Sequence, residues 1–183
     1  MKARVVVCGL NGCGKSTLGK ALAEALGCAF LDVEDYYFPK QNPDYLYDAP
    51  RSQQEVEQLM LADFNTLDRF VFACVGGAWG SEITQHFTHA VMLSVPKDER
   101  LRRIRERSFR KFGDRMLPGG DLYEREQRFF ELAASRDEQR VERWVSALGI
   151  PVLRLDGAQP VVENVEKAIN TLKYENLAAS RHG

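Results

Sequence analysis

A glycine-rich turn near the start of the chain carries residue types that bind phosphate. In GLNGCGKST, residues 9–17, Gly9, Gly14, Lys15 and Ser16 have the spacing Gly, four residues, Gly-Lys-Ser/Thr. Glycines let successive backbone N–H groups point at phosphate oxygens, and the helix that follows adds its positive dipole end. The lysine supplies a charge for the β- and γ-phosphates, and the serine supplies a hydroxyl ligand for Mg²⁺. The residues predicted to hold the nucleotide phosphates are Asn11, Gly12, Cys13, Gly14, Lys15, Ser16 and Thr17.

Carboxylates follow the second hydrophobic segment of the chain. The stretch FLDVED places Asp32, Glu34 and Asp35 where a short strand is expected to end. Open parallel sheets bind their ligands beyond the carboxyl ends of the strands, so these acids are expected to face Lys15 and its phosphates. The alternative is that they cap or solubilise the strand end. We favour a functional role.

Arginines recur at helical spacing in the second half of the chain. Arg100, Arg103, Arg107 and Arg110 share one face of an expected helix. A second arginine row, on the next expected helix, contains Arg136, Arg140 and Arg143. Between the rows lies KFGDRMLPGGD, a Gly- and Pro-containing segment typical of a lid that closes over a nucleotide and brings Arg107, Arg110 or Arg115 to the phosphates. The alternative for any one arginine is a solvated face balanced by glutamates.

The elements that position these residues alternate between strand and helix. Strands are predicted at 4–8, 28–31, 70–75, 90–95 and 151–155, and helices at 15–26, 52–67, 97–112, 123–148 and 161–173. This order indicates an α/β fold: a three-layer sandwich with a five-stranded parallel sheet, helices on both faces and a helical, arginine-rich lid at about 107–122. We expect one domain over residues 1–176 and a frayed tail at 177–183.

Composition excludes several function classes. The 183 residues contain 25 Lys plus Arg and 26 Asp plus Glu, so no global field favours nucleic acid or membrane lipid as a partner. The four cysteines are scattered without a Cys-x-x-Cys pair, which is typical of a reducing compartment. No stretch reaches the ~18 apolar residues of a membrane span. We predict a cytoplasmic protein, a monomer or homodimer, whose partner is a small molecule.

Two nucleotide-binding classes lack their second motif here. No Asn-Lys-x-Asp tetrapeptide is present to read a guanine base. The third expected strand runs into Gly76-Gly77-Ala78-Trp79 and not into an acidic pair, which argues against a large motor or AAA-type ATPase. His86 and His89 lack a third metal ligand and are interpreted as surface residues.

The sequence resembles the small P-loop kinases, which include the shikimate, gluconate, nucleoside and nucleoside monophosphate kinases. Beside the phosphate-binding turn, the segments that carry the resemblance are FLDVED, VGGAWG, VPKDERLRRIRERSFRKFGDR and DGAQPVVENVEKAI. FLDVED, the first of these four segments, is highly specific, whereas each of the other three is individually weak. Together they extend the resemblance over nearly the whole chain.

The resemblance implies a role for each of these segments. Asp32 is expected to join Ser16 in holding Mg²⁺, and either Asp32 or Asp35 is expected to orient or deprotonate the acceptor hydroxyl. Lys15, Arg107 and Arg110 are expected to neutralise the transition state. The residues expected to contact the acceptor are Glu34, Asp35, Arg51, Gly76, Gly77 and Arg136. Those expected to contact the nucleotide beyond the glycine-rich turn are Arg107, Ala158, Gln159 and Pro160.

The implied function is a kinase that depends on ATP and Mg²⁺. Its acceptor would be a hydroxyl of a shikimate-like, sugar acid-like or nucleoside-like metabolite. A nucleoside monophosphate kinase is the alternative within enzymes, although the Asp-Gly-Phe-Pro-Arg string typical of adenylate kinases is absent. An ATP-binding regulator with little or no turnover is the alternative from another class. The aromatic side chains at 36–38, 45, 47 and 79 either pack in the core or at a hinge, or stack on an acceptor ring.

Overall fold

The computed structural model describes residues 3–179 except positions 41, 43 and 78, and residues 180–183 of the predicted tail lie outside the described part. Its strands are β1 (Arg4–Cys8), β2 (Ala29–Asp32), β3 (Phe70–Cys74), β4 (His89–Ser94) and β5 (Val152–Asp156). They form one sheet in the order β2-β3-β1-β4-β5, and every neighbouring pair is parallel. The predicted five-stranded parallel sheet is therefore confirmed.

The central strand β1 determines where a ligand can bind. Val6 of β1 is in register with Phe72 of β3 and Ala90 of β4, and β1 and β3 are almost entirely buried. The chain places β2 and β3 on one side of β1 and β4 and β5 on the other. Such a change of direction leaves a crevice at the carboxyl ends of the strands.

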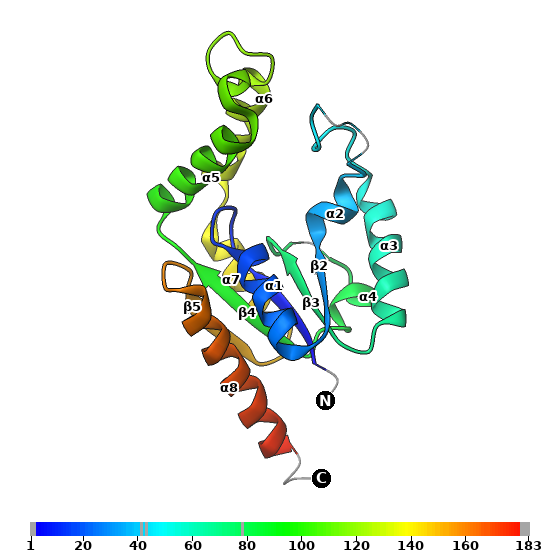
Figure 1. Ribbon diagram of the computed structural model, residues 1–183. Helices are drawn as coiled ribbons and strands as arrows, with labels where there is room; N and C mark the ends of the chain where they lie inside the picture. Colours follow the sequence, from blue (N-terminus) through cyan, green and yellow to red (C-terminus); the bar gives the residue numbers. More distant parts are fainter. Residues whose placement is uncertain (1–2, 41, 43, 78, 180–183) are drawn as a thin grey trace.

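Helices cover both faces of the sheet (Figure 1). The longer helices are α1 (Lys15–Leu26), α3 (Gln53–Thr66), α5 (Lys97–Phe112), α6 (Tyr123–Ser135), α7 (Glu138–Ser146) and α8 (Val161–Ala179); α2 (Val33–Tyr37), α4 (Ser81–Thr84) and the 3-10 helix η1 (Gly113–Met116) are short. Helices α1 and α8 lie side by side in front of the sheet in the view shown, with α7 behind it. Phe64 of α3 stacks on Phe70 of β3, with ring centroids 4.5 Å apart.

The segment after β4 extends beyond the sheet (Figure 1). Helices α5 and α6, joined through η1, pack on a small apolar cluster of their own formed by Ile104, Met116, Phe130 and Ala133. Within the described residues, none of the helices is long and apolar enough to cross a membrane. The separate cluster means that this segment, the lid, is held together by its own contacts.

Several element boundaries differ from those predicted. The helix expected over 123–148 is two helices, because Arg136 adopts an extended backbone and Asp137 caps α7 by accepting a hydrogen bond from the Gln139 N–H. Arg136 therefore does not share a helix face with Arg140 and Arg143. Helix α8 continues to Ala179 and not to 173. The short helices α2 and α4 were not predicted.

Candidate active site

The glycine-rich turn connects β1 to α1 at the carboxyl end of the sheet. Gly12 has φ 85°, and a Cβ atom there would lie 2.5 Å from the Arg100 carbonyl oxygen, so a larger residue does not fit. Gly14 has φ 92° and precedes α1 without a side-chain cap. The first N–H groups of a helix have no partner within the helix. The turn therefore presents uncapped N–H groups and a positive helix end to a ligand.

Lys15 lies within this turn and lines the cavity beyond it. Its Nζ atom donates a hydrogen bond to the Leu10 carbonyl oxygen at 3.0 Å. Burial lowers the pKa of Lys15 from its ordinary value, and the negative charges of Glu34 and Asp32 act in the opposite direction. Lys15, Asp32 and Glu34 all line the same cavity.

Ser16 and Asp32 meet at the same place. The Ser16 hydroxyl donates to Asp32 Oδ2 at 2.5 Å, while Asp32 Oδ1 accepts from the Glu34 backbone N–H at 3.0 Å. Asp32 is thus both the cap of α2 and the hydrogen-bond partner of the Ser16 hydroxyl. Mg²⁺ prefers hard oxygen ligands and usually binds only one or two protein groups beside phosphates and water. This oxygen pair fits that requirement, and the described residues contain no cluster of three or more His, Cys, Asp or Glu side chains that would suit another kind of metal centre.

These residues open onto a cavity of about 800 Å³ at the carboxyl end of the sheet. We call its wall after β4 and β5 the donor half, which includes Arg103, Arg107, Arg136, Ala158, Gln159 and Pro160. The wall after β2 and β3 is the acceptor half, which includes Glu34, Tyr37, Phe38, Gln53, Gly77 and Trp79. The glycine-rich turn and Asp32 lie where the two halves meet.

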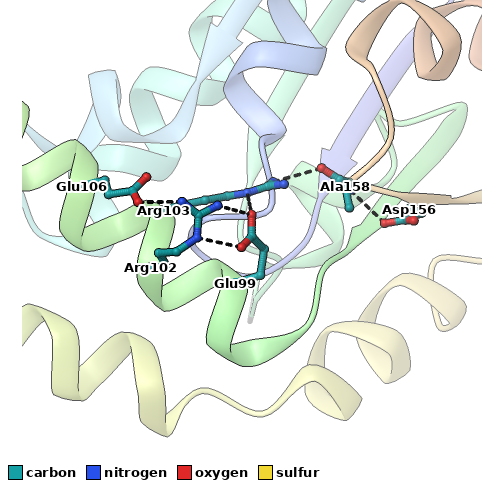
Figure 2. Close-up of polar contacts among 7 residues, drawn as sticks. Glu99, Arg102, Arg103, Glu106, Asp156 and Ala158 are labelled. Atoms are coloured by element: carbon teal, nitrogen blue, oxygen red, sulfur yellow. Dashed lines mark hydrogen bonds and ion pairs between the residues drawn. The ribbon is translucent and has the colours of Figure 1, made fainter.

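Hydrogen bonds order the donor half (Figure 2). Arg103 reaches from α5 to the Gly157 carbonyl oxygen at 3.0 Å and is held by Glu99 at 2.8 Å. The Asp156 carboxylate accepts from the Ala158 N–H at 2.8 Å and thereby shapes the loop after β5. Asn164 is buried and donates to the Asp156 carbonyl oxygen at 2.9 Å, while its Oδ1 atom has no hydrogen-bond partner among the described residues. The loop expected to contact the nucleotide at Ala158, Gln159 and Pro160 is therefore held by hydrogen bonds from three sides.

Two arginines connect the lid to the glycine-rich turn. Arg100 is buried and donates to the Asn11 carbonyl oxygen at 3.2 Å. Arg136, in the bend between α6 and α7, donates to the Asn11 side-chain oxygen. Burial lowers the pKa of Arg136, and the neighbouring Arg140 acts in the same direction. Both ends of the lid therefore contact the residue that precedes Gly12.

A second set of contacts joins the lid to the segment 44–48, which we call the clasp loop. The Tyr45 hydroxyl donates to the buried carboxylate of Glu126 at 3.1 Å, and Tyr45 packs on Phe112 with centroids 5.5 Å apart. Arg115 donates to the Asp44 carbonyl oxygen at 3.0 Å. Arg115, which the sequence offered as a phosphate contact, is also paired with Asp121.

Most of the predicted site residues lie on this one cavity. The residues that line it are Asn11, Gly12, Cys13, Gly14, Lys15, Ser16, Thr17, Asp32, Glu34, Gly76, Gly77, Arg107, Arg136, Ala158, Gln159 and Pro160. Asp35, Arg51 and Arg110 do not line it. Neighbouring positions on a helix point about 100° apart, so α2 directs Glu34 inward and leaves Asp35 exposed, paired with Lys40. Arg51 instead donates to the Tyr36 carbonyl oxygen at 2.7 Å, and Arg110 lies exposed near the end of α5.

The cavity also contains residues that the sequence analysis did not assign to it. Gln53 opens α3, next to the predicted cap Ser52, and its place at a helix start was the available signal. Phe129 and Leu132 of α6 also line the wall, and the side chain of Leu132 is 52% exposed. Apolar residues three apart on a charged lid helix were the signal there. The sequence carried no such signal for Asn164, because its role depends on how α8 packs against the end of β5.

The chain belongs to the family described as an AAA domain, which matches residues 5–115. It is 29% identical over 180 residues to the uncharacterized protein YqaC of Bacillus subtilis (strain 168), which covers 94% of this chain and 98% of YqaC. It is also 30% identical over 115 residues to a shikimate kinase of Thermosynechococcus vestitus, over 57% of this chain and 63% of that enzyme.

Solved structures share the fold. A gluconokinase from Sinorhizobium meliloti 1021 has a TM-score of 0.56 at 19% identity, with 98% of this chain and 97% of that chain covered. A shikimate kinase from Bacteroides thetaiotaomicron has a TM-score of 0.58 at 15% identity, with 93% and 98% covered. The predicted resemblance to the small P-loop kinases is confirmed by these relatives in sequence and by these structures in fold. The missing acidic pair after β3 does not, however, separate this chain from the AAA domain family.

Proposed function

We propose that the protein is a kinase that transfers the γ-phosphoryl group of ATP to a hydroxyl group of a small molecule in the presence of Mg²⁺. The observation that carries the proposal is the 2.5 Å contact between Ser16 and Asp32, next to Lys15, where the two halves of one cavity meet. Phosphoryl transfer needs two bound reactants in line and charge neutralisation around the moving group. The cavity offers room and polarity for both.

The residues that line the cavity would take distinct roles in this reaction. The N–H groups of the glycine-rich turn and the Lys15 ammonium would hold the β- and γ-phosphates, while Ala158, Gln159 and Pro160 would contact the base. Ser16 and Asp32 would hold Mg²⁺, whose charge, when bound, offsets that of the phosphates. Arg107 is the exposed lid arginine on the donor half. Arg107 is therefore the candidate for neutralising the negative charge that develops in the transition state.

The acceptor oxygen forms a bond to the γ-phosphorus while the bond from that phosphorus to the leaving oxygen of ADP breaks. The hydroxyl proton must leave the acceptor oxygen in the same reaction. Asp32 and Glu34 are the carboxylates on the cavity wall, so Asp32 is a stronger candidate than Asp35 to orient or accept this proton. Glu34 would contact the acceptor.

Acceptor-dependent ADP release tests the proposal. Purified protein with ATP and Mg²⁺ is supplied in turn with acids of the shikimate type, sugars, nucleosides and nucleoside monophosphates. Release stimulated by a hydroxyl compound supports the proposal. Phosphorylation of a monophosphate instead supports the nucleotide kinase. ATP binding without stimulated release across the panel supports the regulator.

A further inference from the structure

The distribution of cationic side chains over the cavity wall bears on which acceptor fits. The cationic side chains on the wall of the cavity are Lys15, Arg103, Arg107 and Arg136. The three arginines come from the segment after β4, on α5 and in the bend before α7, which is the part of the wall that we call the donor half. Among the described residues that line the acceptor half, none is a lysine or an arginine. The internal positions outside the described part are Gln41, Pro43 and Ala78, which carry no charge.

Two of the three arginines of the donor half already have partners there, whereas Arg107 is exposed. Arg103 is bonded to the Gly157 carbonyl oxygen and to Glu99, and Arg136 is bonded to the Asn11 side chain. Arg51 and Lys40 lie near α2 but face elsewhere: Arg51 donates to the Tyr36 carbonyl oxygen, and Lys40 pairs with Asp35. The cations around the acceptor half are thus held in other contacts.

The acceptor half itself combines a carboxylate with aromatic rings. Glu34 lines it. Tyr37 and Trp79 lie together on the wall with ring centroids 6.4 Å apart and planes inclined at 45°, and Phe38 is 6.4 Å from Tyr37. Aromatic rings offer large flat contact areas to a ring-shaped ligand, and their faces repel anions.

We infer that the acceptor is a hydroxylated ring compound without an anionic group, such as a nucleoside or a neutral sugar. This inference rests on the proposed kinase function and narrows its acceptor. A carboxylate or phosphate on the acceptor would lie beside Glu34 and Asp32 with no cation of the acceptor half to pair with it. The Gln53 amide, whose Nε2 atom donates to Glu57 at 2.9 Å, is an uncharged group on this wall. Glu34 and the Tyr37 hydroxyl can hydrogen-bond to a neutral polyol.

Matched pairs of acceptors that differ in one anionic group test the inference. The pairs are uridine and uridine 5′-monophosphate, methyl shikimate and shikimate, and glucose and glucuronate. In any pair that reacts, kcat/KM for the member without the anion is expected to be at least about tenfold higher, the scale of one charged hydrogen bond. A preference for the acid or the phosphate in the reactive pair would overturn the inference.

Substitution of Gln53 provides the matched control. Gln53→Arg adds a cation to the acceptor half. It is expected to lower the ratio of kcat/KM for the neutral member to kcat/KM for the anionic member by about tenfold. Gln54→Arg adds the same charge at the next residue, which is exposed and does not line the cavity, and is expected to leave the preference unchanged. Equal effects of the two substitutions would contradict the assignment of Gln53 to the acceptor wall.

Calorimetry with a non-hydrolysable ATP analogue and Mg²⁺ separates this inference from the proposed reaction. Binding of the neutral member to the nucleotide-loaded wild-type protein, in the absence of turnover with ATP, would refute the kinase reaction and leave the acceptor inference standing. Stronger binding of the anionic member, or binding of neither member of any pair, would refute the acceptor inference.

Discussion

Lys15 is the residue on which the phosphate-binding assignment depends most directly. Its side chain crosses the glycine-rich turn to the Leu10 carbonyl oxygen and lines the cavity. Burial lowers the pKa of Lys15, and the charges of Glu34 and Asp32 oppose that shift. A preorganised cation at this point acts on the charge of the migrating phosphoryl group with little rearrangement.

Replacement of this cation is expected to remove catalysis and preserve the fold. Lys15→Ala should lower kcat by roughly 100- to 1000-fold, as the loss of one preorganised donor does. Steady-state ADP release measures the effect, and circular dichroism reports the fold. Lys20→Ala is the matched control, because Lys20 is an exposed lysine of α1 that does not line the cavity. Retained activity in Lys15→Ala would refute the assignment.

The two aspartates at the end of β2 differ in surroundings despite their closeness in sequence. Asp32 contacts Ser16 and caps α2, whereas Asp35 is exposed and paired with Lys40. Asp32→Asn is therefore expected to reduce kcat by roughly 100-fold or more, the scale of a proton-transfer group, and Asp35→Asn by much less. Measurement of kcat for both variants at saturating ATP and acceptor shows which aspartate matters more. The reverse ranking would make Asp35 the group that handles the acceptor proton.

At the scale of elements, the clasp loop and the lid form one connected unit. Tyr45 donates to Glu126, whose other carboxylate oxygen is buried and has no hydrogen-bond partner in the part of the chain that the structure describes. Lys111 lies 4.2 Å from the centroid of the Tyr47 ring, and Arg125 lies 5.2 Å from that of Tyr45. Any opening of the lid away from the acceptor side must break these contacts.

The hydroxyl of Tyr45 is expected to contribute to the stability of this unit. Tyr45→Phe leaves the buried Glu126 carboxylate without its donor and should lower the free energy of unfolding by roughly 1–3 kcal/mol, measured by urea denaturation. Tyr47→Phe is the control, because no hydrogen bond of its hydroxyl is found among the described residues. Equal losses in the two variants would show that the bond to Glu126 contributes nothing.

The same bond gives a pH dependence with a definite sign. Burial and the Glu126 carboxylate raise the pKa of Tyr45 from 10.0 to about 12. Because the folded state holds this proton more tightly, the stabilisation is complete below about pH 10 and declines as the pH rises toward 12. Tyr45→Phe should therefore lose less stability between these pH values than the wild type. An equal decline in both proteins would contradict the assignment.

The sequence predicted those elements whose local signals agree with their tertiary contacts. Continuous apolar runs gave the strands, and the Ser52 cap with Glu55 gave the start of α3. The break at Arg136 was missed because the apolar spacing continues through it, while the Asp137 cap and the bond from Arg136 to Asn11 depend on the folded lid. Helix α2 was missed because it is short and is capped by a residue first interpreted as a ligand.

At the scale of the whole molecule, strand order determines how much of the site was predictable. The carboxyl ends of parallel strands meet at one edge, so Lys15, Asp32 and Gly76 could be placed together from the sequence alone. The sequence alone could not show which neighbouring side chains point into the cavity. Asp35 lies on a short helix and Arg51 in a loop, and both point away from the cavity because of a local geometry that depends on packing. The oligomeric state and the cytoplasmic location stay predictions.

A ligand held between the two halves of one cavity should stabilise the whole domain. At a nucleotide concentration of about 100 times its Kd, binding to the folded state adds roughly 2.7 kcal/mol, which corresponds to a rise in Tm of roughly 5–10 °C for a chain of this size. Differential scanning fluorimetry with ATP and Mg²⁺ measures the shift. Lys15→Ala is expected to reduce it and Lys20→Ala to preserve it, because only Lys15 lines the cavity. An unchanged Tm of the wild-type protein across millimolar nucleotide would mean that the glycine-rich turn does not hold a triphosphate, and the kinase proposal would fall with it.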